Sequence, residues 1–342
     1  MAVVVIACNS IVGVEDVTNR RPRDSGSSSG EEEPEPPQPR DDGGTNEDQL
    51  QTALGEAHSC ARAPGGTVMC WGADDLGQTG SGGAASGGVV DTPMAVADIS
   101  DAVDIAAGRN HTCVARRSGT VSCWGYNVAG QLGNGESNNV KSSPVDVVSL
   151  RAVGVAAGGD FSCAIRAQDG VACWGGNDSG QLGRGNTVGS VTPVAVLDLE
   201  RVISIAAGQG HACAVTEAGK VFCWGEGSNG QLGTGGIDNR TRPTEVDLPS
   251  PARSIAAGQR STCALTDEGS VYCWGANEVG QLGSGASNQT PNPSPIIVTS
   301  LSDAIAIRTG RNHTCATRRN GAVVCWGAGN RGQLGDGSAG AD

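Results

Sequence analysis

The sequence predicts an all-β protein, and three observations support this. The 342 residues include 54 Gly but only 2 Phe, 2 Tyr and 3 Met. Glycine weakens helix interiors, whereas many short strands joined by tight turns require it. No apolar pattern with a helical period runs along the chain. One unit of sequence recurs six times with a spacing of 50 to 53 residues, which is typical of repeat folds.

Each repeat is centred on a tryptophan that follows Cys and precedes Gly. Six residues after the Trp a G-Q-L-G motif begins, which reads G-Q-T-G in the first copy. In the second copy, β-rich runs at residues 103–108, 111–116, 120–125 and 145–150 are separated by turn residues. Four strands per copy predict a β-propeller whose blades are four-stranded and about 50 residues long. The six tryptophans are Trp71, Trp124, Trp174, Trp224, Trp274 and Trp326.

These motifs resemble those of the regulator-of-chromosome-condensation repeat family. The shared pattern is A-A-G-x-x-H-x-C-A, then G-x-V-x-C-W-G-x-N-x-x-G-Q-L-G, then P-x-x-V, and the resemblance covers roughly residues 49–342. It implies a β-propeller, usually of seven blades. The Cys pair in each copy is similar to the bacterial, extracytoplasmic branch of that family.

The two ends of the repeat region differ from its middle. The first copy begins at Leu50, and the last reaches Gly335-Asp336-Gly337 before any P-x-x-V segment. We therefore expect six visible repeats, the last of them lacking its fourth strand. Two interpretations remain open: a six-bladed ring with one open blade, and an incomplete part of a seven-bladed propeller.

Twelve of the 13 cysteines form pairs with one spacing, C-x9-C. Folding the second copy about its turn places Cys113 opposite Cys123, with Gly119 as the left-handed third residue of the loop. We expect a disulfide in every blade. The third copy has Asp169 where others have this Gly, so its turn should differ. The expected disulfides join Cys60 with Cys70, Cys113 with Cys123, Cys163 with Cys173, Cys213 with Cys223, Cys263 with Cys273, and Cys315 with Cys325.

The N-terminal region predicts export. Val5-Ile6-Ala7-Cys8 resembles the lipobox of bacterial lipoproteins, although the apolar run is short and lacks a preceding Lys or Arg. We interpret residues 1–8 as a truncated signal peptide with lipid attachment at Cys8; the alternative is an accidental match and a free thiol. Residues 9–48 carry 11 acidic and 4 basic side chains with many Ser, Gly and Pro, and we expect a disordered linker.

Charge and composition exclude several functions. A net charge of −13 argues against a protein that neutralises nucleic-acid phosphates. No stretch of 18 apolar residues predicts a membrane helix, so the membrane is reached only through the lipid anchor. The repeats contain no Ser-His-Asp set, no paired carboxylates and no phosphate loop, so no catalytic residue is expected. Two Cys per copy cannot supply four convergent metal ligands, so no metal or other cofactor is expected.

The remaining functions are three. The first is a non-enzymatic, lipid-anchored scaffold in the cell envelope, at the outer membrane or cell surface, that binds another protein. The second is nucleotide exchange on a small GTPase, which the resemblance implies through the family's eukaryotic namesake; predicted disulfides argue against a cytosolic partner. The third is a carbohydrate-active or lyase propeller, which would need acidic residues converging on the axis. The A-A-G strands offer none, so we favour the scaffold.

The candidate binding surface is the turn between the A-A-G strand and the H-x-C strand. It has two variable residues per copy, and the same turn in all copies should form a ring on one face. Arg109, Arg260 and Arg311 lie in it, and Arg308 with Thr309 replaces Ala-Ala in the last copy. Arginine is enriched in interface anchors, so we expect this face to bind an acidic protein or envelope polymer. The alternative is a solvated rim with incidental arginines.

Overall fold

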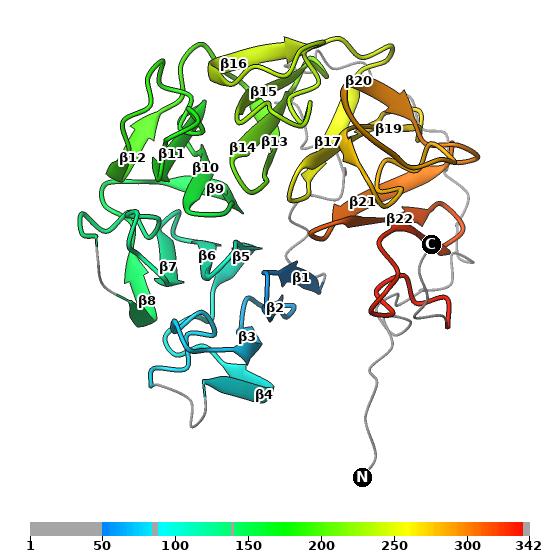
Figure 1. Ribbon diagram of the computed structural model, residues 1–342. Helices are drawn as coiled ribbons and strands as arrows, with labels where there is room; N and C mark the ends of the chain where they lie inside the picture. The colour runs from blue at the N-terminus through cyan, green and yellow to red at the C-terminus, as the bar shows by residue number, and fades with distance from the viewer. Residues whose placement is uncertain (1–49, 84–87, 138–139, 338–342) are drawn as a thin grey trace, which may run out of the picture. The chain divides into compact units, whose positions relative to one another are not determined.

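The computed structural model describes residues 50–83, 88–137 and 140–337. Within them lie 23 strands and no helix, arranged as six antiparallel sheets in a ring (Figure 1). The all-β propeller prediction is therefore confirmed, with five four-stranded blades and a sixth that has three described strands. The predicted signal peptide, the linker and Cys8 lie outside the described residues.

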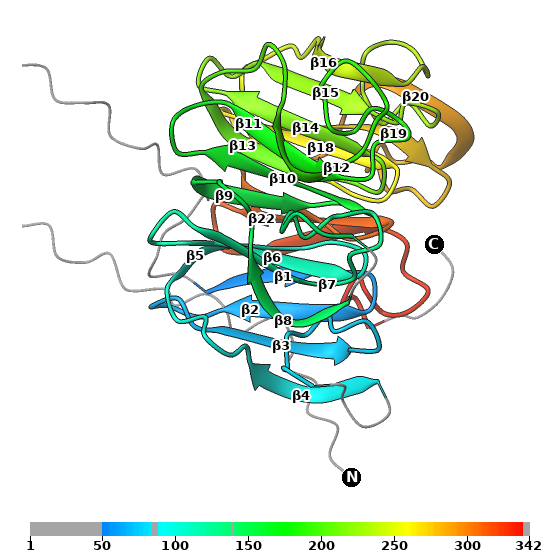
Figure 2. The ribbon, with the colours of Figure 1, turned by 90° about the vertical axis from the view of Figure 1, so that its left-hand side faces the viewer.

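Every blade, numbered 1 to 6 in chain order, runs from an inner strand at the axis to an outer strand at the rim. Figure 2 shows β1 to β4 of blade 1 following one another outward. The innermost strands are β1 Gln51–Leu54, β5 Ala102–Ala107, β9 Ala152–Ala157, β13 Val202–Ala207, β17 Ala252–Ala257 and β21 Ala304–Thr309. The second strands are β2 His58–Arg62, β6 His111–Arg116, β10 Phe161–Arg166, β14 His211–Thr216, β18 Ser261–Thr266 and β22 His313–Arg318.

The remaining strands complete the blades. The third strands are β3 Val68–Ala73, β7 Val121–Gly125, β11 Val171–Gly175, β15 Val221–Gly225, β19 Val271–Asn277 and β23 Val323–Gly327. The outermost strands are β4 Val89–Ala95, β8 Lys141–Asp146, β12 Ser190–Ala195, β16 Arg240–Val246 and β20 Asn288–Ile297.

The outermost strand lies earlier in the chain than the sequence predicted. The expected run was 145–150, but β8 ends at Asp146 and contains Pro144. The reason is a β-bulge: Cys123 pairs with Val145 and Gly125 pairs with Lys141, so four steps of β8 match two of β7. Proline has no backbone N–H to donate to the neighbouring strand. Inside a bulge that hydrogen bond is not needed, so Pro144 can lie within β8 instead of before it.

The predicted register and disulfides are present in every blade. Cys113 lies directly opposite Cys123, with Cα atoms 4.1 Å apart. Gly119 has φ +83°, as the three-residue loop requires. The third copy does differ, because Asp169 takes the left-handed position with φ +104° and Gly170 follows with φ +76°. The other five disulfides join Cys60 with Cys70, Cys163 with Cys173, Cys213 with Cys223, Cys263 with Cys273, and Cys315 with Cys325.

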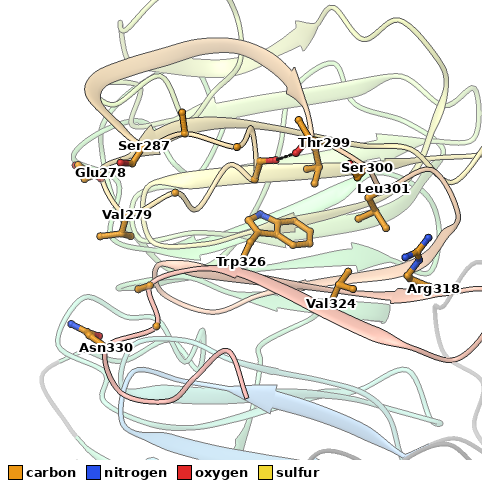
Figure 3. Close-up of a pocket in the computed structure, with 17 residues that line it drawn as sticks. Glu278, Val279, Ser287, Thr299, Ser300, Leu301, Arg318, Val324, Trp326 and Asn330 are labelled. Atoms are coloured by element: carbon orange, nitrogen blue, oxygen red, sulfur yellow. Dashed lines mark hydrogen bonds between the residues drawn. The ribbon is translucent and has the colours of Figure 1, made fainter. Parts of the chain in front are cut away.

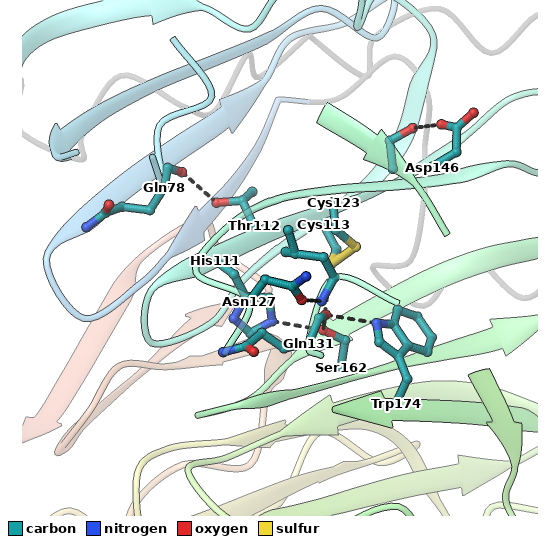
Figure 4. Close-up of a disulfide and its surroundings, with 12 residues drawn as sticks. Gln78, His111, Thr112, Cys113, Cys123, Asn127, Gln131, Asp146, Ser162 and Trp174 are labelled. Carbon is teal, nitrogen blue, oxygen red and sulfur yellow. Dashed lines mark hydrogen bonds between the residues drawn. A yellow bond between two sulfur atoms is a disulfide. The ribbon is translucent and has the colours of Figure 1, made fainter. Parts of the chain in front are cut away.

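Neighbouring blades are joined by the tryptophan and the G-Q-L-G loop. The indole N–H of Trp174 in blade 3 donates to the backbone carbonyl of Gln131 in blade 2 at 2.8 Å (Figure 4). The ring itself is fully buried and packs on Leu132 and on Val147, the last residue of P-x-x-V. The same Trp-to-Gln bond recurs at Trp124–Gln78, Trp224–Gln181, Trp274–Gln231 and Trp326–Gln281, at 2.8 to 3.0 Å.

The histidine of H-x-C makes a second bond across the same joint. His111 Nε2 lies 2.8 Å from the hydroxyl of Ser162 in blade 3, and that hydroxyl donates to the Gln131 carbonyl. His58 and His211 contact Thr112 and Thr262 of the next blade in the same way.

Blade 3 departs from this histidine pattern in a way that matches its neighbour. Phe161 stands at the histidine position, and the hydroxyl that would meet it is replaced by Ala212 in blade 4. Both side chains are fully buried in one apolar cluster. The polar pair is thus exchanged for an apolar pair at the same place, which leaves no hydroxyl there without its partner.

The joint between blade 6 and blade 1 is different. Trp71 is only half-buried, and no described residue accepts a hydrogen bond from its indole. Val323 of blade 6 is 52% exposed, although its counterparts in the other blades are at most 1% exposed. Among residues 50–337 as the structure describes them, these two faces therefore lack the inter-blade packing of the other five joints.

Loss of one disulfide should weaken the fold measurably. The core has few large apolar side chains, and closing a loop of this length contributes about 2–3 kcal/mol in the chain-entropy model. Replacing both Cys213 and Cys223 by Ala should lower the free energy of unfolding by about that amount or less, measured by chemical denaturation. The single change Cys213→Ala should be worse, because the remaining thiol can mispair. Thiol titration of the unfolded, unreduced protein should find no free thiol besides Cys8; additional free thiols would contradict the pairing.

Candidate functional site

The turns predicted to form a ring lie together at one end of the propeller axis, which we call the channel mouth. A small cavity of about 130 Å³ sits there, and all six blades line it. Each blade contributes the end of its inner strand, the Gly of A-A-G and the first variable turn residue. These first residues are Glu56, Arg109, Gly159, Gln209, Gln259 and Arg311.

The glycine of A-A-G is required by close packing at this mouth. A Cβ on Gly108 would lie 2.5 Å from the ring of His111 and 2.4 Å from the carbonyl oxygen of Gly158 in the next blade. Both distances are far inside van der Waals contact, so a larger residue would push the blades apart. Because glycine has no side chain, the histidine ring and the turn of the next blade can both pack against it.

Backbone hydrogen bonds connect the turns in sequence. The amide of the first turn residue in one blade donates to a turn carbonyl of the next, as from Arg109 to Gly158 at 3.0 Å and from Gln259 to Arg311 at 2.9 Å. Such bonds span the five joints from blade 1 to blade 6. Between blade 6 and blade 1 a side-chain contact takes their place, because Arg311 Nη1 lies 3.0 Å from Glu56 Oε1.

Side chains form a second, polar belt on the same turns. Glu56 Oε2 accepts from Arg109 Nε at 3.0 Å while Oε1 accepts from Arg311. Arg311 Nε donates to Gln259 Oε1 at 2.7 Å, and Gln259 Nε2 donates to Gln209 Oε1 at 2.6 Å. All but blade 3, which has Gly159, contribute to this polar belt.

The belt changes the expected electrostatics of the face. Arg109 and Arg311 share one carboxylate, so the three charged groups together carry one positive charge instead of two. Both arginine side chains remain about half exposed, at 48% and 58%. Exposed ion pairs of this kind contribute about 0–1 kcal/mol, so the pairs do little for stability and leave the arginines available to a partner.

Arg260 does not join the other two arginines. It occupies the second turn position and forms an ion pair with Glu278 of its own blade at 3.2 Å, and it does not line the mouth cavity. Successive residues of an extended turn point in different directions, which separates the first position from the second. Sequence position alone grouped the three residues together.

The last copy brings extra polarity to the axis, as its sequence indicated. Thr309 lines the mouth cavity. Arg308 is exposed and its Nη1 donates to the carbonyl of Ile307 at 2.8 Å. Burial raises the pKa of Asp104 in blade 2, and the positive charge of Arg308 partly opposes that rise.

The expectation that the A-A-G strands carry no acidic residue is wrong at one position, because Asp104 lies on the inner strand β5. Its carboxylate accepts hydrogen bonds from Gln51 Nε2 at 2.5 Å and from the amide of Val155 at 2.8 Å, and so it joins three blades. Burial raises the pKa of this carboxyl above its usual range, against these hydrogen bonds. Ser204 occupies the same position in blade 4, and its hydroxyl accepts a hydrogen bond from the backbone amide of Ile255 in blade 5. A polar side chain at this position therefore connects neighbouring blades.

Three histidines, His58, His111 and His211, are buried between blades. Burial lowers the pKa of His58 and of His211 to about 4, and that of His111 to about 3. These imidazoles are therefore neutral near pH 7 and face the next blade instead of the channel.

Two other kinds of site are missing from the described part of the chain. In the described ranges, no three His, Cys, Asp or Glu side chains come together as a metal site would require. Over the same residues, no helix has the length and apolarity needed to cross a membrane.

Comparison with known protein families shows to which family the chain belongs. Residues 141–342 match the RCC1-like domain, and residues 102–131 and 65–115 match the regulator of chromosome condensation (RCC1) repeat. The chain belongs to the RCC1-like family. The resemblance drawn from the A-A-G, C-W-G and G-Q-L-G motifs is thus confirmed.

Relatives of this RCC1-like protein align over one part of it. The RCC2 homolog of Danio rerio is 34% identical over 93 residues, which is 27% of this chain and 18% of that protein. Human RCC2 is 33% identical over 94 residues, or 27% of this chain and 17% of its own length. The alignments thus span less than a fifth of these relatives.

Two solved structures share the fold. Human WBSCR16 superposes with a TM-score of 0.76 at 22% identity, covering 86% of this chain and 80% of its own. Prp20p of Saccharomyces cerevisiae gives 0.74 at 24% identity, covering 85% and 74%. At these identities the likeness concerns the propeller architecture.

The buried histidines should make stability depend on pH. Their pKa in the folded state lies below the 6.5 of an unfolded chain, so the unfolded state binds more protons as the pH falls below about 6.5. The free energy of unfolding should therefore decrease between pH 6 and pH 4, by up to about 1.4 kcal/mol per pH unit for each histidine. The double change His111→Phe with Ser162→Ala reproduces the Phe161–Ala212 contact between blades 2 and 3. It should reduce the dependence of the free energy of unfolding on pH by the contribution of one histidine. Urea denaturation across this range measures it, and an unchanged slope would contradict the assignment.

Proposed function

We propose that this RCC1-like protein is an exported, lipid-anchored β-propeller that acts as a scaffold by binding another protein at the channel mouth. The observation that carries the proposal is the convergence of six turns on one face, with Arg109, Glu56 and Arg311 half exposed within a connected belt. Half-exposed arginines held in place by neighbours lose little freedom on binding, which suits them as interface anchors.

The disulfides support an oxidising compartment for this scaffold. All twelve cysteines of the repeats are paired, and such pairs persist in secreted, periplasmic and cell-surface proteins. We propose an extracytoplasmic location in the cell envelope, with Cys8 as the lipid attachment site and residues 9–48 as a spacer. The acidic chain with its single net positive charge at the mouth favours an acidic partner over nucleic acid.

Nucleotide exchange on a small GTPase is the second candidate. Prp20p, with which this chain shares the fold, was crystallised in a study of its binding to Gsp1p and histones. Paired cysteines in every blade favour a partner outside the cytosol instead, so the scaffold remains our proposal.

The binding face can be tested with two matched arginine variants. The double change Arg109→Ala and Arg311→Ala should weaken binding to the partner recovered from the native cell envelope by about tenfold or more, since both residues lie at the mouth. Arg260→Ala removes an arginine from the same kind of turn but away from the cavity, and it should change the affinity by less than about twofold. Equal losses for both variants, or none for the first, would move the binding site off the mouth.

The anchor can be tested separately from the binding face. Expressed in the native host behind a functional signal peptide, the parent protein should partition into the detergent phase. Cys8→Ser should stay in the aqueous phase, because it cannot accept the lipid. A variant that partitions like the parent would disprove attachment at Cys8.

A further inference from the structure

Two cavities differ in whether their charged side chains still have hydrogen-bond donors to offer. A cavity of about 710 Å³ lies at the rim of blade 6, beside Trp326 (Figure 3). Arg318 in its wall already forms an ion pair with Asp303 at 2.8 Å. Glu278 in its wall forms one with Arg260 at 3.2 Å. The cavity at the channel mouth is smaller, but its arginines are only partly engaged.

The two arginines at the mouth use part of their hydrogen-bonding capacity. A guanidinium group has five N–H donors. Arg109 donates to Glu56 through Nε alone. Arg311 donates through Nε to Gln259 and through Nη1 to Glu56. Within the described part of the chain, both Nη groups of Arg109 and Nη2 of Arg311 have no partner. N–H donors of this kind suit the two oxygens of a carboxylate.

The backbone around the cavity has little left to offer a ligand. The glycine that precedes each first turn residue donates its amide within its own blade, as Gly108 does to the carbonyl of His111. The amides of the first turn residues of blades 1 to 5 donate to the next blade, as that of Gln259 does to Arg311. Recognition of an anion at the mouth therefore depends on the guanidinium groups.

Below this polar belt the mouth has an apolar floor. The floor is formed by the second residue of A-A-G in four blades, together with Leu54 and Thr309. This residue stands two positions before the first turn residue, which is about 7 Å in an extended chain. Leu54 is 57% exposed although it lines the cavity, so apolar surface is accessible there. The four residues are Ala107, Ala157, Ala207 and Ala257.

The volume of the cavity fits one side chain of medium size. An apolar protein cavity of about 150 Å³ holds a benzene molecule. The mouth cavity, at about 130 Å³, is slightly smaller. It therefore has room for a branched aliphatic side chain such as that of valine or leucine.

A single residue of a polypeptide carries both groups that the mouth can take. A C-terminal residue presents a carboxylate and a side chain from the same Cα atom. An internal acidic residue would reach the belt but leave the floor empty, and moving its carboxylate down to the alanines would bury a charge without a partner. An internal apolar residue would cover the guanidinium donors without supplying an acceptor. A C-terminal valine or leucine satisfies both levels.

We propose that the channel mouth captures the C-terminus of its partner, with an apolar last side chain on the alanine floor and the terminal carboxylate between Arg109 and Arg311. Capture of a C-terminal carboxylate is an established mode of peptide recognition. The incoming charge neutralises the single net positive charge of the two arginines and Glu56. This inference rests on the protein-binding function proposed above and specifies which part of the partner is bound.

The experiment uses fluorescent octapeptides of Gly and Ser that differ only in their last residue, and the full chain with its disulfides intact. Fluorescence anisotropy should show saturable binding of the peptide that ends in leucine with a free carboxylate. Amidation of that carboxylate should weaken binding by about tenfold or more, because it removes the charge that pairs with the arginines. Glycine in place of the last leucine should weaken binding by a similar factor, because the floor is left empty.

Two matched alanine variants locate the floor within blade 4. Ala207→Leu fills the cavity and should weaken binding of the leucine peptide by about tenfold or more. Ala218→Leu adds the same bulk to an exposed residue of the hairpin between β14 and β15, at the opposite end of the blade. It should leave the affinity within about twofold. The thermal midpoint of each variant, compared with the parent, checks that the fold is intact.

Arginine variants test the carboxylate independently of the floor. Arg109→Ala with Arg311→Ala should lower the affinity for the free-acid peptide to that for the amide, while the amide binds the parent and the variant within about twofold of each other. Arg260→Ala, away from the cavity, should leave both affinities unchanged.

The outcomes distinguish this inference from the scaffold function. If the envelope partner binds in a way that depends on Arg109 and Arg311 but the free-acid peptide does not bind saturably, or binds no better than its amide, C-terminal capture is wrong and the scaffold function stands. If the peptides behave as expected but the envelope partner is indifferent to both arginines, capture stands and the proposed binding face for that partner is wrong.

Discussion

The bond from each tryptophan indole to a glutamine carbonyl of the preceding blade determines how the sheets are joined. A sheet of four short strands, poor in large apolar residues, has little core of its own. Its Trp packs against the leucine of the G-Q-L-G loop and the final Val of P-x-x-V in the preceding blade. The hydrogen bond from the indole N–H holds the ring in its orientation there. Because the glutamine carbonyl also accepts from Ser162 or Thr262, one backbone atom organises two side chains of the next blade.

This joint explains where the functional surfaces can lie. Blades docked in one direction bring all their inner turns to the same mouth, so Glu56 and Arg311 meet although 255 residues separate them in the chain. The same direction brings the G-Q-L-G loops of blades 1 to 4 against the outermost strand of the blade that follows, as where the amide of Gly135 donates to the carbonyl of Val191. The disulfides stiffen each hairpin, while the tryptophans and histidines form hydrogen bonds to the neighbouring blade.

Much of this was predictable from the sequence because the repeat is local and strictly spaced. The period, the opposition of Cys113 and Cys123 and the turn at Gly119 follow from residues close together in the chain. The sequence also shows that copy three has Phe161 in place of the histidine and that copy four has Ala212 in place of the hydroxyl residue. These two replacements, one repeat apart, indicate that the two positions contact each other across neighbouring blades. The placement of Arg260 away from Arg109 depended on side-chain direction within a turn, and the start of β8 on a bulge, neither of which the motif spacing reveals.

Blade docking is directional, and the six indole groups report on it individually. Hydrogen exchange of the indole N–H groups, followed by NMR on the nitrogen-15-labelled full chain, tests this most directly. Trp124, Trp174, Trp224 and Trp274 are fully buried and bonded to the preceding blade, and their exchange should be slower than that of Trp71 by about a hundredfold or more. Protection of Trp71 equal to that of Trp124 would contradict the account.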